Sequence, residues 1–226
     1  ILLTFKKKEK VARDTYSFYF EPMSALSFLP GQFLELTYPH KNPDSRGVRR
    51  YFSIASSPQE KQVMVTMKII DKSSSFKKAL QAMKEGEQLT MTSPQGEFVL
   101  PNDKAIPLAF IAGGIGITPF HSMLESLLKE NENRDVVLLY TNSTEEDVAF
   151  KELLEKAKKA GVTTITFITE KEGHVTTTVL AEKIPDYSKR AFYISGPQPM
   201  VDAFKKMLNE IKVTTIKTDF FPGYTK

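Results

Sequence analysis

Hydrophobic and polar residues alternate along much of the first hundred residues, which is the pattern of half-buried β-strands. The segments 33–38 and 63–69 both repeat with a period of two, and turn-forming pairs such as Pro30-Gly31 separate the runs. Only residues 76–83 interrupt this part with a short helical pattern. The pattern predicts a small antiparallel barrel.

The pattern changes after the polar, proline-flanked stretch 101–107. Beyond it, apolar strand runs alternate with helical segments, an arrangement that predicts a parallel sheet wrapped by helices. We expect strands at 108–112, 136–141, 163–169, 191–195 and 213–218, and helices at 119–129, 145–160 and 199–211. A capping box, Ser143 with Glu146, begins the second of these helices. The sequence therefore predicts a β-barrel domain over residues 1–103 and an α/β domain over residues 104–226.

The composition is that of a globular protein, with 41% hydrophobic and 26% charged residues among 226. No apolar segment is long enough to span a membrane, and no charged and then apolar leader opens the chain, so we expect a cytoplasmic protein without membrane insertion. Since the chain begins with Ile1, whether it is part of a longer protein stays open.

The residue types exclude several kinds of site. The chain has no cysteine, which rules out disulfides, cysteine nucleophiles and any iron–sulfur cluster held by this chain. The net charge is +4, and the basic residues are dispersed along the chain. This distribution does not indicate a nucleic-acid-binding surface. The three histidines, His40, His121 and His174, are scattered, and we expect no metal site. If the protein moves electrons, another cofactor would therefore carry them.

A glycine-rich turn follows the first strand of the α/β half. Gly113, Gly114 and Gly116 lie between an apolar run and a helix that has Pro119 near its first position. Glycines let the backbone approach an anion, and unpaired N–H groups at a helix start attract one, so the turn suits a pyrophosphate. It is not the G-x-G-x-x-G fingerprint, because Pro119 stands where the third glycine would fall. Glycines that serve only tight packing are the alternative.

A second candidate lies in the barrel half, where an arginine, aromatic rings and a hydroxyl follow one another from Arg50 to Ser53. Arginine suits a phosphate, an aromatic ring suits a flat heterocycle, and a hydroxyl can donate to a ring nitrogen. On a strand, Arg50 and Phe52 would share a face and Ser53 would lie on the other. The alternative is a surface arginine beside a core aromatic residue.

Five motifs in order along the chain resemble those of the ferredoxin:NADP reductase family of flavoproteins. They are Pro30 to Phe33 (P-G-Q-F), Arg50 to Ser53 (R-x-Y-S), Ser93 to Phe98 (G-P-x-G-x-F), Gly113 to Pro119 (G-G-x-G-x-T-P) and Gly196 to Met200 (C-G-P-x-x-M). The resemblance covers nearly the whole chain and implies FAD between a flavin-binding barrel and an NAD(P)-binding domain. The departure at Phe52, where the family has tyrosine, puts flavin affinity in doubt.

The resemblance also implies roles for single residues. Arg50 would hold the flavin phosphate, Phe52 would pack against the isoalloxazine, and Ser53 would lie near its N5 atom. Thr118 would lie near the nicotinamide, and Phe221 would cover the flavin face, with Tyr224 as the alternative. The implied catalytic residues are Ser53, Ser195 and Asp219. The implied cofactor-binding residues are Arg50, Tyr51, Phe52, Ser53, Ser73, Ser74, Ser75, Gly113, Gly114, Gly116, Thr118, Pro119, Gly196, Pro197, Met200, Phe221 and Tyr224. Plain helix capping is the alternative for Ser73 to Ser75.

The implied function is hydride transfer from NADH or NADPH to FAD, followed by electron transfer to an external acceptor such as ferredoxin, flavodoxin or a cytochrome. Glu170 would repel a 2′-phosphate while Lys171 would attract one, so the sequence favours NADH only weakly. We expect a monomer. The alternatives are a ferric or free-flavin reductase, a non-catalytic electron-transfer subunit and a binding module without flavin.

Overall fold

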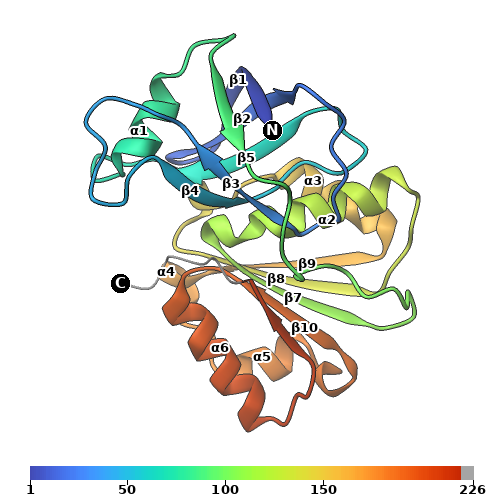
Figure 1. The fold of residues 1–226 in the computed structure, drawn as a ribbon. Helices are drawn as coiled ribbons and strands as arrows, with labels where there is room; N and C mark the ends of the chain where they lie inside the picture. The colour runs from blue at the N-terminus through green and yellow to red at the C-terminus, as the bar shows by residue number, and fades with distance from the viewer. Residues whose placement is uncertain (220–226) are drawn as a thin grey trace.

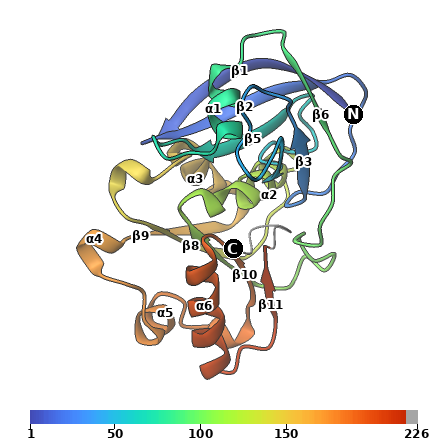
Figure 2. The ribbon, with the colours of Figure 1, turned by 60° about the vertical axis from the view of Figure 1, so that its left-hand side comes forward.

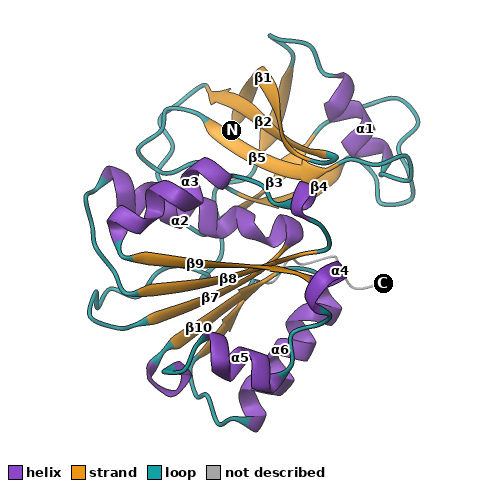
Figure 3. Ribbon diagram, turned by 180° about the vertical axis from the view of Figure 1, so that it is seen from behind, coloured by secondary structure: helices purple, strands orange, loops and turns teal. Residues whose placement is uncertain are grey.

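The computed structural model describes residues 1–219, and its strands form two separate sheets (Figures 1 and 3). The first sheet is antiparallel and barrel-like, with six strands in the order β4-β3-β6-β1-β2-β5. Its strands are β1 (Leu2–Ala12), β2 (Thr15–Pro22), β3 (Phe33–Thr37), β4 (Arg49–Ser53), β5 (Val63–Lys68) and β6 (Gln88–Met91). The helix predicted at 76–83 is α1, Ser75–Ala82, between β5 and β6.

Strand β5 lies between the inside of the barrel and the second half of the chain. Val63, Val65 and Met67 belong to the barrel core, as their alternation predicts. Met64 and Thr66, on the other face of the strand, are also buried. This outer face of β5 is buried because the strand packs against the second half of the chain, where it contacts the glycine-rich turn.

The second sheet is parallel and has the strand order β11-β10-β7-β8-β9. Its strands are β7 (Leu108–Gly113), β8 (Val136–Asn142), β9 (Val162–Ile168), β10 (Ala191–Ser195) and β11 (Ile216–Thr218). Helices α2 (Thr118–Lys129) and α3 (Lys151–Ala157) cover the face toward the barrel, while α5 (Thr177–Lys183) and α6 (Gln198–Glu210) cover the opposite face (Figures 2 and 3). The architecture is the predicted antiparallel barrel followed by a parallel α/β unit.

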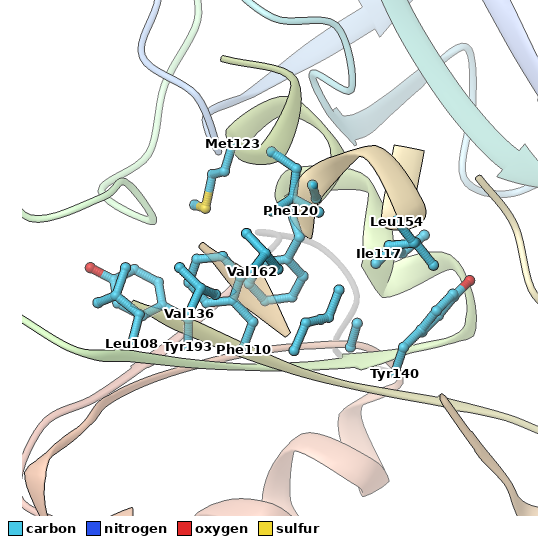
Figure 4. Packing of buried hydrophobic residues seen from close by; sticks show 14 of the residues in the cluster. Leu108, Phe110, Ile117, Phe120, Met123, Val136, Tyr140, Leu154, Val162 and Tyr193 are labelled. Atoms are coloured by element: carbon cyan, nitrogen blue, oxygen red, sulfur yellow. The ribbon is translucent and has the colours of Figure 1, made fainter. Parts of the chain in front are cut away.

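Strand β7 is buried on both faces, which explains its continuous apolar run. Leu108 and Phe110 pack toward α2, where Phe110 stacks on Phe120 with 4.6 Å between ring centroids (Figure 4). Ala109 and Ile111 belong to the cluster on the α6 side. The carboxyl end of β7 is thereby fixed at the middle of the sheet, between β10 and β8.

The prediction of one helix over 145–160 was wrong. The chain forms a 3₁₀ turn, η2 (Glu145–Asp147), then α3 and a second 3₁₀ turn, η3 (Lys158–Ala160). Val148 is extended, and Phe150 has a left-handed backbone with φ of 58°, so the helix cannot run through. Burial of Val148 and Ala149 in the core side of the sheet outweighs the helical propensity of this stretch.

The capping box also differs from the predicted pair. It consists of Thr144 and Asp147, one residue later than Ser143 and Glu146. Two further helices, α4 (Thr169–Glu172) and α5, were not predicted, and β11 is shorter than the expected 213–218. The short elements lack a full apolar period, so their sequence carries little signal.

Helix α2 joins the two halves through buried polar contacts. Nδ1 of His121 lies 2.7 Å from the carbonyl oxygen of Ala55, and the Ser122 hydroxyl donates to the carbonyl of Ser56 at 2.6 Å. Burial lowers the pKa of His121 to about 4, so the ring is neutral at physiological pH. Within the described residues, no helix is long and apolar enough to cross a membrane.

Candidate functional site

A cavity of about 260 Å³ lies between the barrel and the parallel sheet. The barrel contributes residues of β4, β5 and α1. The second half contributes the turn after β7, the start of α2, the end of β10 with the turn after it, and the residue that follows β11. Its lining residues are Tyr51, Phe52, Ser53, Thr66, Met67, Lys77, Ile115, Gly116, Thr118, Ser195, Gly196, Pro197, Gln198 and Asp219. The cavity therefore brings residues 51–53 and the glycine-rich turn to one place, although they belong to different halves of the chain. Arg50 does not line it.

The three residues predicted as catalytic meet at this cavity. Asp219 follows β11, and its Oδ2 atom accepts hydrogen bonds from the hydroxyl of Ser195 at 3.0 Å and from that of Ser53 at 3.5 Å. Ser195 ends β10, which is paired with β11, while Ser53 ends β4 of the barrel. A carboxyl group thus connects the two domains through two hydroxyls.

The environment of Asp219 favours its neutral form. Burial raises the pKa of this carboxyl to about 7, although the hydrogen bonds from Ser195 and Ser53 act in the opposite direction. Within the described residues, no basic side chain forms an ion pair with it. Near neutral pH, the group can therefore take up or release a proton in the cavity.

Strand β4 presents different residues on its two faces. Arg50 and Phe52 both contact Phe76 of α1, with 5.4 Å from the guanidinium carbon and 6.1 Å from the Phe52 ring to the Phe76 ring centroid. Tyr51 lies edge-on to Phe33 on the other face, where Ser53 meets Asp219. The predicted division of this strand into two faces is confirmed. Phe52 is only 7% exposed, Tyr51 is half-buried, and both line the cavity.

The guanidinium of Arg50 is buried and turned toward the loop before β4. It donates to the carboxylate of Asp44 at 2.8 Å and to the backbone carbonyls of Arg46, Gly47 and Arg49. Its Nε atom is buried without a hydrogen-bond partner. A buried guanidinium with an unused donor fits a further anionic ligand, since such a group is costly to leave unpaired.

The hydroxyls of Ser73, Ser74 and Ser75 all make hydrogen bonds within the barrel half. Ser73 accepts from the backbone of Ile70, Ser74 caps α1 by accepting from Lys77, and Ser75 accepts from the backbone N–H of Asp44. The N–H of Ser75, at the start of α1, donates to the Asp44 carboxylate at 3.0 Å. Asp44 therefore lies between Arg50 and the helix start, which are the two groups predicted to hold a diphosphate.

The glycines of the β7 turn serve two different purposes. Gly114 has φ of +51°, and a Cβ built on it would meet nothing within 4 Å, so its backbone faces open space. A Cβ on Gly116 would lie 2.2 Å from the carbonyl oxygen of Ser195, and one on Gly113 would lie 2.2 Å from the sulfur of Met200. Close packing explains Gly113 and Gly116, while Gly114 leaves the turn accessible to a ligand.

The remaining predicted residues of the nucleotide half surround that turn. Thr118 begins α2 and lines the cavity, while Pro119 occupies the first turn of the same helix. Gly196 and Pro197 connect β10 to α6 and also line the cavity. Met200 packs between the two turns, because a Cβ on Gly196 would also meet it, at 2.6 Å. Phe221 and Tyr224 lie outside the described residues.

Five residues that line the cavity were not singled out from the sequence: Thr66, Met67, Lys77, Ile115 and Gln198. Lys77 carries the most informative side chain, with Nζ donating to the carbonyl of Lys68 at 3.0 Å. Burial lowers the pKa of Lys77, and the nearby charges of Arg46 and Arg50 lower it further. Its place on α1, one turn after the serine run, is the signal that could have identified it. Among the described residues, no cluster of side chains could hold a metal ion.

Residues 2–100 match the family model of the oxidoreductase FAD-binding domain, and residues 110–206 match the oxidoreductase NAD-binding domain. The chain belongs to the oxidoreductases that combine this FAD-binding domain with this NAD-binding domain. Its fold is that of ferredoxin-NADP⁺ reductase. The FAD-binding and NAD-binding domains confirm the expected cofactor classes, and the two sheets confirm the expected fold.

Individual relatives and solved structures are similar to the chain over most of its length. The chain is 26% identical over 226 residues to a flavohemoprotein of Oceanobacillus iheyensis, an alignment that covers 92% of this chain and 55% of the relative. The chain thus spans about half the length of the curated relatives it matches. Among solved structures, a cytochrome P450 reductase of Amycolatopsis has a TM-score of 0.84 at 23% identity, covering 98% of this chain and 70% of that one. Ferredoxin-NADP⁺ reductase of Plasmodium falciparum has a TM-score of 0.80 at 19% identity, with coverage of 97% and 95%.

Proposed function

We propose that this chain transfers hydride from NADH or NADPH to bound FAD and passes the electrons to an external acceptor. The observation that carries the proposal is the hydrogen-bonded set of Ser53, Ser195 and Asp219 at a cavity between the flavin half and the nucleotide half. When bound, FAD supplies the two-electron acceptor for the hydride and can release the electrons singly. The protein's contribution is alignment, exclusion of water and proton handling.

The flavin side would be held by residues of the barrel. Arg50 and the start of α1 at Ser75 are the groups that would hold the diphosphate. Arg50 has a buried donor without a partner, and the N–H of Ser75 at the helix start would exchange the Asp44 carboxylate for a phosphate oxygen. Tyr51 and Phe52 offer flat aromatic surfaces at the cavity wall. Lys77, which also lines the cavity, adds a cationic donor on the same side.

The nucleotide side would be held by the two turns that follow β7 and β10. The open backbone at Gly114 suits the pyrophosphate, and Thr118 lines the cavity where the nicotinamide has to enter. Ser53 would present its hydroxyl to the reactive edge of the flavin, and Asp219 would hold or release a proton beside it. Its pKa of about 7 suits a group that exchanges protons near neutral pH.

We assign residues 1–103 to the flavin domain and residues 104–226 to the nucleotide domain, a division supported by the end of the barrel sheet at β6 and the start of the parallel sheet at β7. The acceptor would be a one-electron carrier of the ferredoxin, flavodoxin or cytochrome kind. A monomeric state and a cytoplasmic location stay predictions from the sequence.

The second candidate is a reductase that treats flavin as an exchangeable substrate. Asp44 favours it, because its carboxylate holds both Arg50 and the start of α1 and would compete with the flavin diphosphate. Phe52 also lacks the phenolic hydroxyl that the family's tyrosine carries. Retention of FAD through gel filtration separates the two candidates, since an exchangeable flavin would be lost and a resident one kept.

An anaerobic titration of the FAD-loaded protein with NADH, and separately with NADPH, tests the proposal directly. Bleaching of the flavin absorbance at stoichiometric nucleotide is the expected result. A protein that binds FAD but is bleached by neither nucleotide would contradict hydride transfer. A protein that takes up no FAD would contradict both candidates.

A further inference from the structure

One edge of the parallel sheet is a long strand without a charged residue. Strand β9 is the last in the strand order and lies at the outside of the sheet (Figure 2). Its sequence, VTTITFI, contains neither a charge nor a proline and is rich in β-branched residues. Soluble proteins normally protect an edge strand with charges, with proline or by keeping it short, because its unpaired N–H and C=O groups can pair with another chain.

The other sheet edges in the described part of the chain have such protection. Strand β11 has only three residues, and one of them is Lys217. Strand β4 carries Arg49 and Arg50, and β5 packs against the glycine-rich turn of the second half. Strand β9 is therefore the exception among the edges that the structure describes.

The open part of β9 is centred on Ile165. Residues 163–166 are exposed or half-buried, and among the described residues β8 is the only strand that pairs with β9. At the end of the strand, the N–H of Ile168 donates to the carboxylate of Glu172 at 2.9 Å, so this backbone group already has a partner. The segment left for pairing is 163–167.

This segment is complementary to itself in the antiparallel direction. A twofold axis at Ile165 places Thr164 of one copy opposite Thr166 of the other, and Thr163 opposite Phe167. Threonine pairs and pairs of an aromatic with a β-branched residue both stabilise neighbouring strands. The hydroxyl oxygen of Thr164 is buried without a hydrogen-bond partner in the described chain. In a different χ1 rotamer it would meet the hydroxyl of Thr166 on the second copy.

The charges that flank β9 favour the same arrangement. The η3 turn before the strand carries Lys158 and Lys159, and helix α4 after it carries Glu170 and Glu172. In an antiparallel pair, the start of one strand lies beside the end of the other, so lysines of one copy would face glutamates of the other at both ends. Parallel pairing would bring like charges together.

Two of these charges are free to act in this way. Lys159 and Glu170 are exposed, and neither forms an ion pair within residues 1–219. The neighbouring lysines already have partners, since Lys158 pairs with a glutamate of α3 and Lys171 pairs with Glu145, both at 2.6 Å. The opposite charges left over at the two ends of β9 therefore match each other across a twofold axis.

We propose that two copies of this chain pair antiparallel along β9 and so join their parallel sheets into one. The contact closes at two copies, because both use the same edge. Such a dimer would replace the monomer that the sequence leads us to expect. A single strand edge buries less than the about 1,200 Å² of a standard interface, so we expect a dissociation constant on the order of 10 µM.

Sedimentation velocity of the FAD-loaded protein, over concentrations from about 1 to about 200 µM, measures the assembly. The mass should rise from one chain to two across this range. Hydrogen exchange at the two ends of the range locates the contact, because the backbone amides of 163–167 should exchange more slowly in the concentrated sample. A single chain at every concentration would overturn the proposal.

Thr166→Lys tests the edge itself. The substitution places a charge opposite Thr164 of the second copy and should weaken the dimer by at least about tenfold. The matched control is Thr90→Lys, the same change at an exposed position of β6 in the barrel sheet, which should leave the dimer intact. Equal weakening in the two variants, or none in Thr166→Lys, would contradict pairing along β9.

A charge exchange tests the antiparallel direction. Lys159→Glu and Glu170→Lys should each weaken the dimer, because each brings like charges together at both ends. The double variant restores opposite charges and should recover most of the native dissociation constant. A double variant no stronger than the single ones would overturn the twofold arrangement. Because the readout is mass, the outcome is independent of whether the chain reduces FAD.

Discussion

The hydroxyl of Ser195 donates to the carboxyl group of Asp219 across 3.0 Å, at the point where the last two strands of the parallel sheet end. The same carboxyl oxygen reaches the barrel through Ser53 at 3.5 Å. Because strands β10 and β11 are paired in parallel, their carboxyl ends meet at one edge and bring these side chains together. A titratable group is thereby held at the junction of the two domains.

Asp219→Asn should change how stability depends on pH. The carboxyl has a folded pKa of about 7 against an ordinary value of 3.8, so the folded protein keeps a proton that the unfolded chain releases in this range. Its contribution is fully present below about pH 4 and is lost as the pH rises to about 7. The variant should therefore be more stable than the native chain at pH 8, by up to about 4 kcal/mol, as measured by urea unfolding. Asp202→Asn, an exposed carboxylate on α6, is the control and should show no such trend.

Arg50→Ala should weaken FAD binding by about 10- to 100-fold, because the buried guanidinium is the strongest phosphate donor near the helix start. Flavin fluorescence quenching measures the dissociation constant. Arg49→Ala removes the same charge from the exposed neighbour on β4 and should alter binding little. Since Arg50 also supports its own loop, Arg50→Lys is the second variant, which keeps the charge. If Arg50→Ala and Arg50→Lys both bind FAD with the native affinity, Arg50 does not hold the flavin phosphate.

Gly116→Ala should be more damaging than Gly114→Ala. The added Cβ at Gly116 would lie 2.2 Å from the carbonyl oxygen of Ser195, so the two turns would have to separate. We expect a loss of about 2–3 kcal/mol in the free energy of unfolding and slower flavin reduction. Gly114 has open space, and its substitution costs only the strain of a positive φ, about 1 kcal/mol. Thermal and urea unfolding measure the loss of stability in each variant. If the two variants lose the same stability, the turns relax to accept the added Cβ and the prediction is contradicted.

Asp147→Asn should loosen the contact between the η2 turn and the barrel. Burial raises the pKa of Asp147. Hydrogen bonds from Lys68, Thr144 and Arg13 lower it by more, so the pKa of this carboxyl is below its ordinary value. This contribution is present above about pH 4 and is lost as the pH falls through the lowered pKa. At pH 7 we expect a loss of about 1–3 kcal/mol by urea unfolding. Glu146→Gln, the exposed neighbour, should cost much less, and a similar cost would contradict the role of Asp147.

Local patterns predicted most of the regular elements, and the reason is visible in single segments. Strand β10 was predicted with the bounds it has, because its apolar run lies between Arg190 and the turn-forming pair Gly196-Pro197. The helix predicted at 145–160 failed because Val148 and Ala149 are drawn into the core and Phe150 takes a left-handed backbone. Tertiary packing overrides helix propensity where apolar residues can be buried better in another conformation.

The sequence by itself determined the two architectures, the family motifs and the residue types available for chemistry. Period-two and strand–helix patterns follow from local geometry, so they can be read without a structure. Only the tertiary structure decided that Ser53, Ser195 and Asp219 meet, that Asp44 lies between Arg50 and α1, and that Lys171 is paired with Glu145. These contacts join residues far apart in the chain, and their strength depends on burial and distance, which no local pattern encodes.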